Sequence, residues 1–329
     1  MIAHSIEETG QIMLKKRFLI PVLLLLSVLS LFVGVKEIQL TGLLQGDQEQ
    51  WQILWVSRLP RLISLIIAGA SMGIVGLIMQ QLSRNRFVSP TTAGTEDSAR
   101  LGILVSLLLF GSATTLQKML LAFLFALLGT LLFMKILARI RFKNAVFIAL
   151  VGLMLGNVID SVTTFFAYKH DLIQSIGAWF YGDFSMIVSG RYEMMYISIP
   201  LIVIAYLYAD RFTIAGMGEE FSVNLGLNYR QAVNIGMVIV ALVTAAVILT
   251  VGVIPFLGLI IPNIVTILRG DHLRQNLFLT ALLGSVFLLV CDILGRILIY
   301  PYEIPIGLTV GIIGSGVFLY LLLRSRGHG

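Results

Sequence analysis

Long apolar runs, separated by short clusters of charged residues, are the feature that most limits how this chain can fold. The runs lie near 18–36, 60–82, 101–113, 115–138, 145–167, 192–209, 231–251, 256–268, 276–299 and 306–323. A helix of about 20 apolar residues crosses the hydrocarbon core of a bilayer. Backbone polar groups in that core must bond within helices, because no water is present. The pattern therefore predicts an all-α polytopic membrane protein with about ten transmembrane helices.

Composition agrees with this interpretation and excludes a water-soluble enzyme domain. Hydrophobic residues make up 58% of the 329 positions and charged residues 12%, with a mean hydropathy of +0.96. The sequence contains no Gly-x-x-x-x-Gly-Lys-Ser/Thr loop for phosphates and no His-Glu-x-x-His or Cys-x-x-Cys spacing for a metal. We therefore expect no catalytic, metal or cofactor site in this chain, and no nucleic acid among its partners.

The distribution of positive charge predicts the orientation. If residues 1–17 are cytoplasmic and the runs alternate, 15 Lys and Arg residues fall inside and seven fall outside. Cytoplasmic loops carry such an excess in membrane proteins. The count predicts a cytoplasmic segment at 1–17, one transmembrane domain at 18–326, a cytoplasmic C-terminus and a cytoplasmic segment at 210–230.

The segment 210–230 is polar and punctuated by glycine, which is typical of a docking element between two membrane spans. Glu219 and Glu220 suit the positive end of a short helix, and Gly226 suits its end. The apolar positions recur at a spacing of four and are Met217, Phe221 and Leu225. The segment is thus predicted to form a two-turn helix with one apolar face for a partner.

A break in the helical pattern separates the runs at 231–251 and 256–268. The second run is too short to cross a core of about 30 Å at about 1.5 Å per residue. Broken helices often line transport pathways, although a proline kink in an ordinary bundle has the same pattern. We therefore take Gly252, Pro255 and Gly258 as pathway candidates.

Two carboxylates lie inside apolar runs, where an unpaired charge is costly. Asp292 precedes Arg296 by four residues, a helical spacing that predicts an ion pair with a structural role. Asp160 has no partner nearby in the sequence, and is either a packed polar contact or a pathway residue. If both carboxylates bound coupling ions, the chain would be a secondary transporter driven by an ion gradient.

Three arginines are placed at the outer ends of apolar runs. Arg58 and Arg61 flank Pro60 at a helix start, where the helix dipole disfavours cations. Lipid headgroups or an acidic extracytoplasmic partner would compensate for this. Arg296 could join the same surface, so all three are candidates for docking.

Several motifs occur in the order and spacing of a known permease family. They are Arg58-Leu-Pro-Arg61, Arg84-Asn85, Gly252-x-Ile254-x-Phe256-x-Gly258-Leu-Ile-x-Pro262, Arg269-Gly-Asp271-His272, Asp292-x-x-x-Arg296 and Glu303-Ile-Pro305-x-Gly307. Over nearly its whole length the chain resembles the FecCD-type permeases. These are the membrane subunits of type II ABC importers for iron-siderophores, haem and cobalamin.

The resemblance implies a fold like that of the cobalamin importer permease, paired with a second copy or a paralogous permease around a translocation path. It also implies two ABC ATPase subunits that use ATP and Mg, and an extracytoplasmic substrate-binding lipoprotein. In that arrangement Arg58, Arg61 and Arg296 meet glutamates of the binding protein. The ATPase contact then involves Met217, Glu219, Glu220, Phe221, Leu225 and Gly226.

The chain departs from the family pattern in two motifs. It has Asn85-Arg86-Phe87 in place of Asn-Pro-Leu, and Pro262-Asn263 in place of Pro-His. The stretches 89–95 and 99–102 resemble a subgroup associated with catecholate-type siderophores in Gram-positive bacteria. The expected cargo is therefore a ferric siderophore, with catecholates favoured and with haem or cobalamin as the alternative.

Overall fold

A computed structural model describes residues 16–34, 36, 38–139, 145–174 and 182–325. These residues are mostly helical, and the strand-like pairing among them is confined to an isolated bridge between Ile299 and Tyr302. The predicted all-α class is thereby confirmed. Most of the predicted segment 1–17 lies outside the described residues, as does residue 326 at the end of the predicted domain.

The helices follow the apolar runs. In chain order they are α2 (Lys16–Phe32), α3 (Leu40–Leu44), α4 (Gln48–Ile53), the π-helical turn η1 (Leu54–Arg58), α5 (Leu59–Ser83), α6 (Thr95–Phe110), α7 (Thr115–Arg139), α8 (Ala145–Lys169), the 3-10 turn η2 (Glu193–Ile197), α10 (Ser198–Leu207), α11 (Ala209–Gly216), α12 (Glu219–Asn224), α13 (Tyr229–Val251), α14 (Leu257–Arg269), α15 (Leu273–Ile297) and α16 (Ile306–Ser325).

Not all of these helices are long enough to span a membrane. By length and composition, five of the described helices can cross a bilayer, or six if Glu193–Leu207 and Ala209–Gly216, bent by 63°, form one span. Shorter apolar helices occur at Arg17–Phe32, Leu257–Arg269 and Ile306–Tyr320. Each predicted run therefore coincides with a helix, whereas the count of ten spans stays a prediction.

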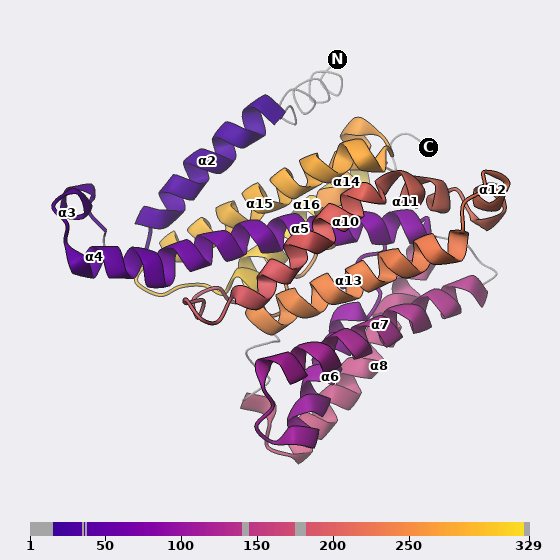
Figure 1. The fold of residues 1–329 in the computed structure, drawn as a ribbon, viewed down its shortest axis with the longest axis horizontal. Helices are drawn as coiled ribbons and strands as arrows, with labels where there is room; N and C mark the ends of the chain where they lie inside the picture. The colour runs from indigo at the N-terminus through magenta and orange to yellow at the C-terminus, as the bar shows by residue number, and fades with distance from the viewer. Residues whose placement is uncertain (1–15, 35, 37, 140–144, 175–181, 326–329) are drawn as a thin grey trace.

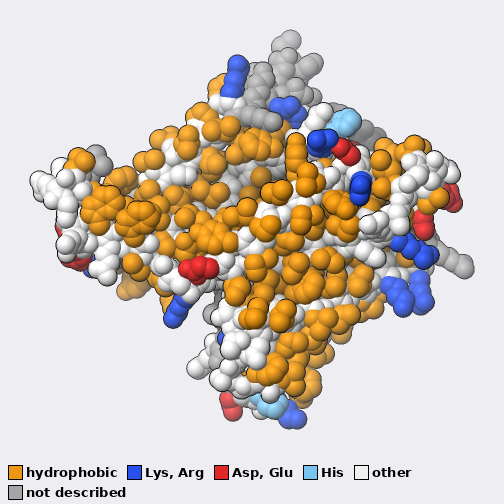
Figure 2. All heavy atoms as spheres, in the orientation of Figure 1, with side chains coloured by type: hydrophobic (Ala, Val, Ile, Leu, Met, Phe, Trp, Pro, Cys, Tyr) orange, Lys and Arg blue, Asp and Glu red, His pale blue; other side chains and the backbone are white. Residues whose placement is uncertain are grey.

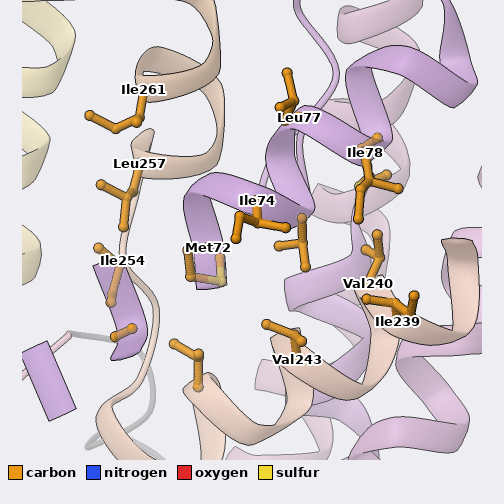
Figure 3. Packing of buried hydrophobic residues seen from close by; sticks show 14 of the residues in the cluster. Met72, Ile74, Leu77, Ile78, Ile239, Val240, Val243, Ile254, Leu257 and Ile261 are labelled. Carbon is orange, nitrogen blue, oxygen red and sulfur yellow. The ribbon is translucent and has the colours of Figure 1, made fainter. Parts of the chain in front are cut away.

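Helix α5 is the centre of the bundle (Figure 1). It packs against α13, α14 and α15; α6 and α7 pack on α13, and α8 packs on α6. Figure 3 shows the buried apolar side chains where α5, α13 and α14 meet; they include Met72, Ile74, Leu77, Ile78, Ile239, Val240, Val243, Leu257 and Ile261. Apolar side chains also cover the middle of the outer face, and charged ones gather near the helix ends (Figure 2). Such a surface suits surrounding lipid.

Glycine allows α5 to approach its neighbours closely. A Cβ on Gly69 would lie under 3.0 Å from the backbone of Gly284 in α15. A Cβ on Gly76 would lie under 3.0 Å from the carbonyl of Gly258 in α14. Small residues at such positions let helix backbones touch, so these glycines serve packing within one chain.

Candidate docking, coupling and translocation sites

The outer start of α5 carries two of the predicted docking arginines. Pro60 has no N–H, so the carbonyl of Val56 lacks its helical donor and accepts a hydrogen bond from the N–H of Ser189 at 2.9 Å. Arg58 ends the π-helical turn and Arg61 lies in the first turn of α5. The two residues are only 8% and 9% exposed, so neither side chain lies freely on the surface.

Arg61 belongs to a buried ion-pair network. Its Nε and Nη2 donate to Oδ1 of Asp292 at 3.1 and 2.8 Å, and its Nη1 donates to Oε2 of Glu303 at 2.7 Å. The other oxygen of Asp292 binds Arg296, which confirms the pair predicted from the sequence. For Arg61, the expected compensation thus comes from carboxylates of the chain itself, and not from lipid or a partner.

Arg58 and Arg296 also hold the C-terminal end of α2. Arg58 donates to the carbonyl of Val33 at 2.7 Å, and Arg296 donates to the carbonyls of Ser30 and Val33 at 2.9 and 2.6 Å. The last carbonyls of a helix lack partners within it and attract cations. The docking role of Arg58, Arg61 and Arg296 stays a prediction, and all three guanidinium groups already have partners within the chain.

Asp160 in α8 has a partner that its local sequence did not reveal. Its Oδ1 lies 3.2 Å from Nη2 of Arg100 in α6, and Arg100 also binds Asp97. This pairing agrees with the packed polar contact considered from the sequence. The Asp160 side chain is nevertheless 38% exposed. A pathway role for it therefore stays a prediction.

Next to Asp160, α8 exposes a polar stripe that the sequence analysis missed. Asn157, Ser161 and Thr164 are all exposed and follow the helical spacing i, i+4 and i+7. Polar side chains in the middle of a span are costly against lipid. This spacing inside an apolar run is the signal that could have identified the stripe.

The predicted break between α13 and α14 is present and enclosed by protein. Gly252 has a φ of 81°, and the carbonyl of Val251 accepts a hydrogen bond from the N–H of Asp183 at 2.8 Å. Gly258 is buried between α5 and the loop after it, because a Cβ there would lie 3.1 Å from the Met72 carbonyl. Gly252 is buried too, and Pro255 is partly exposed. Their pathway role stays a prediction.

The predicted coupling segment forms α11, a turn and α12, at the end of the bundle opposite α3 and α4 (Figure 1). Helix α12 is shorter than the two turns predicted, since Gly218 with φ 115° and Gly226 with φ 76° bracket it. Glu219 and Glu220 lie in its first turn. Four apolar side chains are more than half exposed: Met217 55%, Phe221 51%, Val223 59% and Leu225 58%. Val223 was not among the predicted residues.

The exposed cluster consists of Met217, Phe221, Val223 and Leu225, and its first three members line a cavity of about 900 Å³. The cavity is lined by α12 and by Arg84 at the end of α5. Ser222 fixes α12 to α11, because its hydroxyl donates to the carbonyl of Ile214 at 3.0 Å. Among the described residues, no group of three His, Cys, Asp or Glu side chains is arranged to hold a metal ion.

The two departures from the family pattern meet in space. Nδ2 of Asn263 donates to the carbonyl of Arg86 at 2.8 Å. The guanidinium of Arg86 pairs with Asp271 at 3.1 Å, and the ring of Phe87 packs edge-on against Phe318 at 5.9 Å between centroids. The loop that follows α5 is therefore fastened to α14, to the turn after α14 and to α16.

Comparison with known proteins gives the family. The model of the FecCD transport family matches residues 22–324. The chain is 63% identical over 315 residues to the petrobactin import system permease protein YclN of Bacillus subtilis, covering 96% of this chain and 100% of the relative. It is 39% identical over 296 residues to the ferric-anguibactin transport system permease protein FatD of Vibrio anguillarum, covering 90% and 94%.

The fold is similar to that of a solved metal-chelate type ABC transporter in an inward-facing conformation. The TM-score is 0.78 at 22% identity, over 93% of this chain and 97% of that one. The chain belongs to the FecCD transport family and is a multi-pass, non-catalytic transport protein of the cell membrane.

Proposed function

We propose that this chain is the permease subunit of an ABC importer that moves a ferric siderophore into the cell. The observation that supports this proposal most strongly is the 63% identity, over 96% of the chain, to a permease named for petrobactin import. A second relative, named for ferric-anguibactin, supports an iron-siderophore over haem or cobalamin. Ferric petrobactin is therefore the first cargo to test, and the catecholate preference stays a prediction.

The exposed cluster on α12 supports an ATPase as the partner at the cytoplasmic end. Its four apolar side chains are each more than half exposed; Phe221 and Val223 lie in α12, and Met217 and Leu225 lie just before and just after it. Contact with water is unfavourable for such a surface, by about 25 cal/mol for each Å² of apolar area. We assign α12 to a groove of one of two ATPase subunits, which bind the ATP and Mg.

The polar stripe on α8 supports a second permease beside this chain. The exposed polar side chains are Asn157, Ser161 and Thr164, and contact with water or protein is more favourable for them than contact with lipid. A water-containing path between two permeases provides such contact, and places Asp160 at the border of that path. The second permease is either another copy of this chain or a related chain. An extracytoplasmic binding lipoprotein delivers the cargo at the opposite end from α12.

The test begins with affinity purification of the tagged chain from its native membrane in mild detergent, with partners identified by mass spectrometry. We expect an ATPase in a stoichiometric amount, and ATP-dependent uptake of ferric petrobactin by the reconstituted complex. A chain that purifies without any ATPase, and whose uptake collapses with an ionophore, would instead support a gradient-driven transporter.

The substitution Phe221→Asp tests the assignment of α12. A carboxylate in the middle of the apolar cluster should greatly reduce ATPase retention, because it would have to be buried without a partner. Leu44→Asp is the matched control, since Leu44 is 80% exposed in α3 at the other end of the bundle. Normal ATPase retention by the Phe221 variant would exclude α12 from the contact.

A further inference from the structure

The junction between α11 and α12 rests on the last turn of α5. Gly216 and Gly218 flank Met217 in this junction. The side-chain amide of Gln81 covers Gly216, where an added Cβ would lie under 3.0 Å from Nε2. The guanidinium of Arg84 covers Gly218, with Nη1 3.0 Å from the position of an added Cβ. Gln81 and Arg84, three residues apart at the end of α5, thus lie against two glycines of the coupling segment. We call this pair of contacts the seat.

The seat has a second attachment to α11. Nε2 of Gln81 donates to the carbonyl of Thr213 at 3.4 Å. Gly218 can hold Arg84 at this distance because it has no side chain, and its φ of 115° also requires glycine. The contact therefore depends on the residues at both sides of the junction.

The backbone at Arg84 is unusual for its residue type. Arg84 ends α5 in the left-handed region, with φ 52° and ψ 37°, a position where glycine is ordinarily preferred. Helices α6, α13 and α14 also end at a residue with a positive φ, and in each of them that residue is a glycine: Gly111, Gly252 and Gly270. Glycine would be less strained than arginine at this position. The presence of arginine therefore indicates that its side chain has a role there.

The residues after Arg84 lead directly to the elements that bound the proposed path. The Arg86 carbonyl accepts a hydrogen bond from Asn263 of α14, and Pro90 lies against Gly258 of the same helix. The carbonyl of Thr92 lies against Gly152 of α8, where an added Cβ would lie under 3.0 Å away. The loop 84–94 therefore touches both α14 and α8.

We propose that Gln81 and Arg84 are positioning residues that transmit the movement of α12 to α14 and α8. This rests on the proposed function, because it assumes that an ATPase moves α12. Arg84 lines the cavity beside Met217, Phe221 and Val223, whereas Gln81 does not. Neither residue adds an apolar side chain to the exposed cluster, so the loss of either should leave the ATPase bound. The expected defect is hydrolysis without transport.

The test compares Arg84→Gly, Gln81→Ala and Arg84→Lys in the whole transporter, purified with its ATPase and reconstituted in proteoliposomes. Glycine keeps the left-handed backbone and removes the guanidinium, so the melting temperature should stay the same or rise. ATP hydrolysis and uptake of radioiron-labelled ferric petrobactin, delivered by the binding protein, are measured together. Arg211→Ala is the matched control, since Arg211 lies on α11 and stacks on Tyr208 at 4.7 Å.

For Arg84→Gly we expect hydrolysis within about twofold of the unmodified transporter and at least about a tenfold fall in cargo moved per ATP. Gln81→Ala should shift this ratio in the same direction, and Arg84→Lys should restore most of it. An unchanged ratio in Arg84→Gly refutes the proposal, and so does a parallel fall in hydrolysis and uptake or a loss of the ATPase. If the unmodified chain holds no ATPase or moves no ferric petrobactin, the proposed function fails first.

Discussion

Replacing Asp292 by asparagine removes the charge at the centre of the outer ion-pair network. Asp292 binds Arg61 through one oxygen and Arg296 through the other. Asparagine has nearly the same shape but cannot balance two guanidinium groups. With Arg58, the network holds three cations and two carboxylates, so the substitution changes its net charge from +1 to +2.

Burial determines the size of the effect. The side chains of Asp292 and Arg296 are each 1% exposed, and that of Arg61 is 10% exposed. Breaking a buried ion pair by removing one partner costs about 3–5 kcal/mol, because the remaining charge is left without compensation. The Glu303 side chain is 23% exposed and has one contact with Arg61. Glu303→Gln should therefore cost only about 1–2 kcal/mol.

The two variants are ranked by thermal unfolding of the purified chain in detergent. Unfolding is monitored as the loss of the monodisperse peak in size-exclusion chromatography. We expect a clearly lower melting temperature for Asp292→Asn than for Glu303→Gln. The double variant Asp292→Asn/Arg296→Gln should lose less than the sum of its single changes, because the stranded cation is removed as well. Additive losses, or an Asp292 variant as stable as the Glu303 variant, would refute the central role of Asp292.

Two further substitutions probe the contacts around α14. Gly76→Ala should strongly destabilise the chain in the same unfolding assay, because its methyl group would lie well under 3.0 Å from the backbone carbonyl oxygen of Gly258. Gly73→Ala should be tolerated better, because its methyl group would lie 3.1 Å from the Thr280 side chain and 3.2 Å from the Thr280 carbonyl; equal losses would contradict this packing. Asn263→Asp should lower both stability and uptake, since it replaces the donor to the Arg86 carbonyl by an acceptor, whereas Asn263→His keeps a donor and should retain both. A tolerated aspartate would show that this hydrogen bond is dispensable.

Features that depend on neighbouring residues could be predicted from the sequence. The apolar run 115–138 became α7 at Thr115–Arg139, since a long apolar segment in lipid has few alternatives to a helix. The pair of Asp292 and Arg296 followed from a spacing of four on one helix. The break after α13 was visible from Gly252 and Pro255.

Helix ends were harder to predict, because hydropathy marks the part of a helix that lipid tolerates and not the whole helix. The run 60–82 is only part of a continuous helical stretch at Gln48–Ser83. With 36 residues it is about 54 Å long, well beyond a core of about 30 Å. Polar residues in its outer part, such as Glu49 and Arg58, hid that extension. The same applies to α6, which begins at Thr95 and includes Glu96 and Asp97.

The grouping of Arg296 with Arg58 and Arg61 was expected, but the partners that hold distant parts of the chain together could not be predicted. Arg61 meets Asp292 and Glu303 across more than half of the sequence, and no local pattern encodes that pairing. For the same reason Arg61 was expected to need lipid or an external acid. The seat of Gln81 and Arg84 on the glycines of the coupling segment was invisible too, because it depends on how α5 and α11 approach each other.

The pairing of the membrane carboxylates bears on how transport is driven. A carboxylate that couples an ion gradient to transport must bind and release its ion in each cycle. Asp292 instead holds two arginines in a site that is almost closed to solvent, and Asp160 has Arg100 beside it. Arginine keeps its charge in proteins, so it provides a permanent counterion that lowers the cost of burying a carboxylate. The buried charges of Asp292 and its two arginines therefore hold helices together. The surface at α12 stays the predicted place at which an outside source of energy acts on the chain.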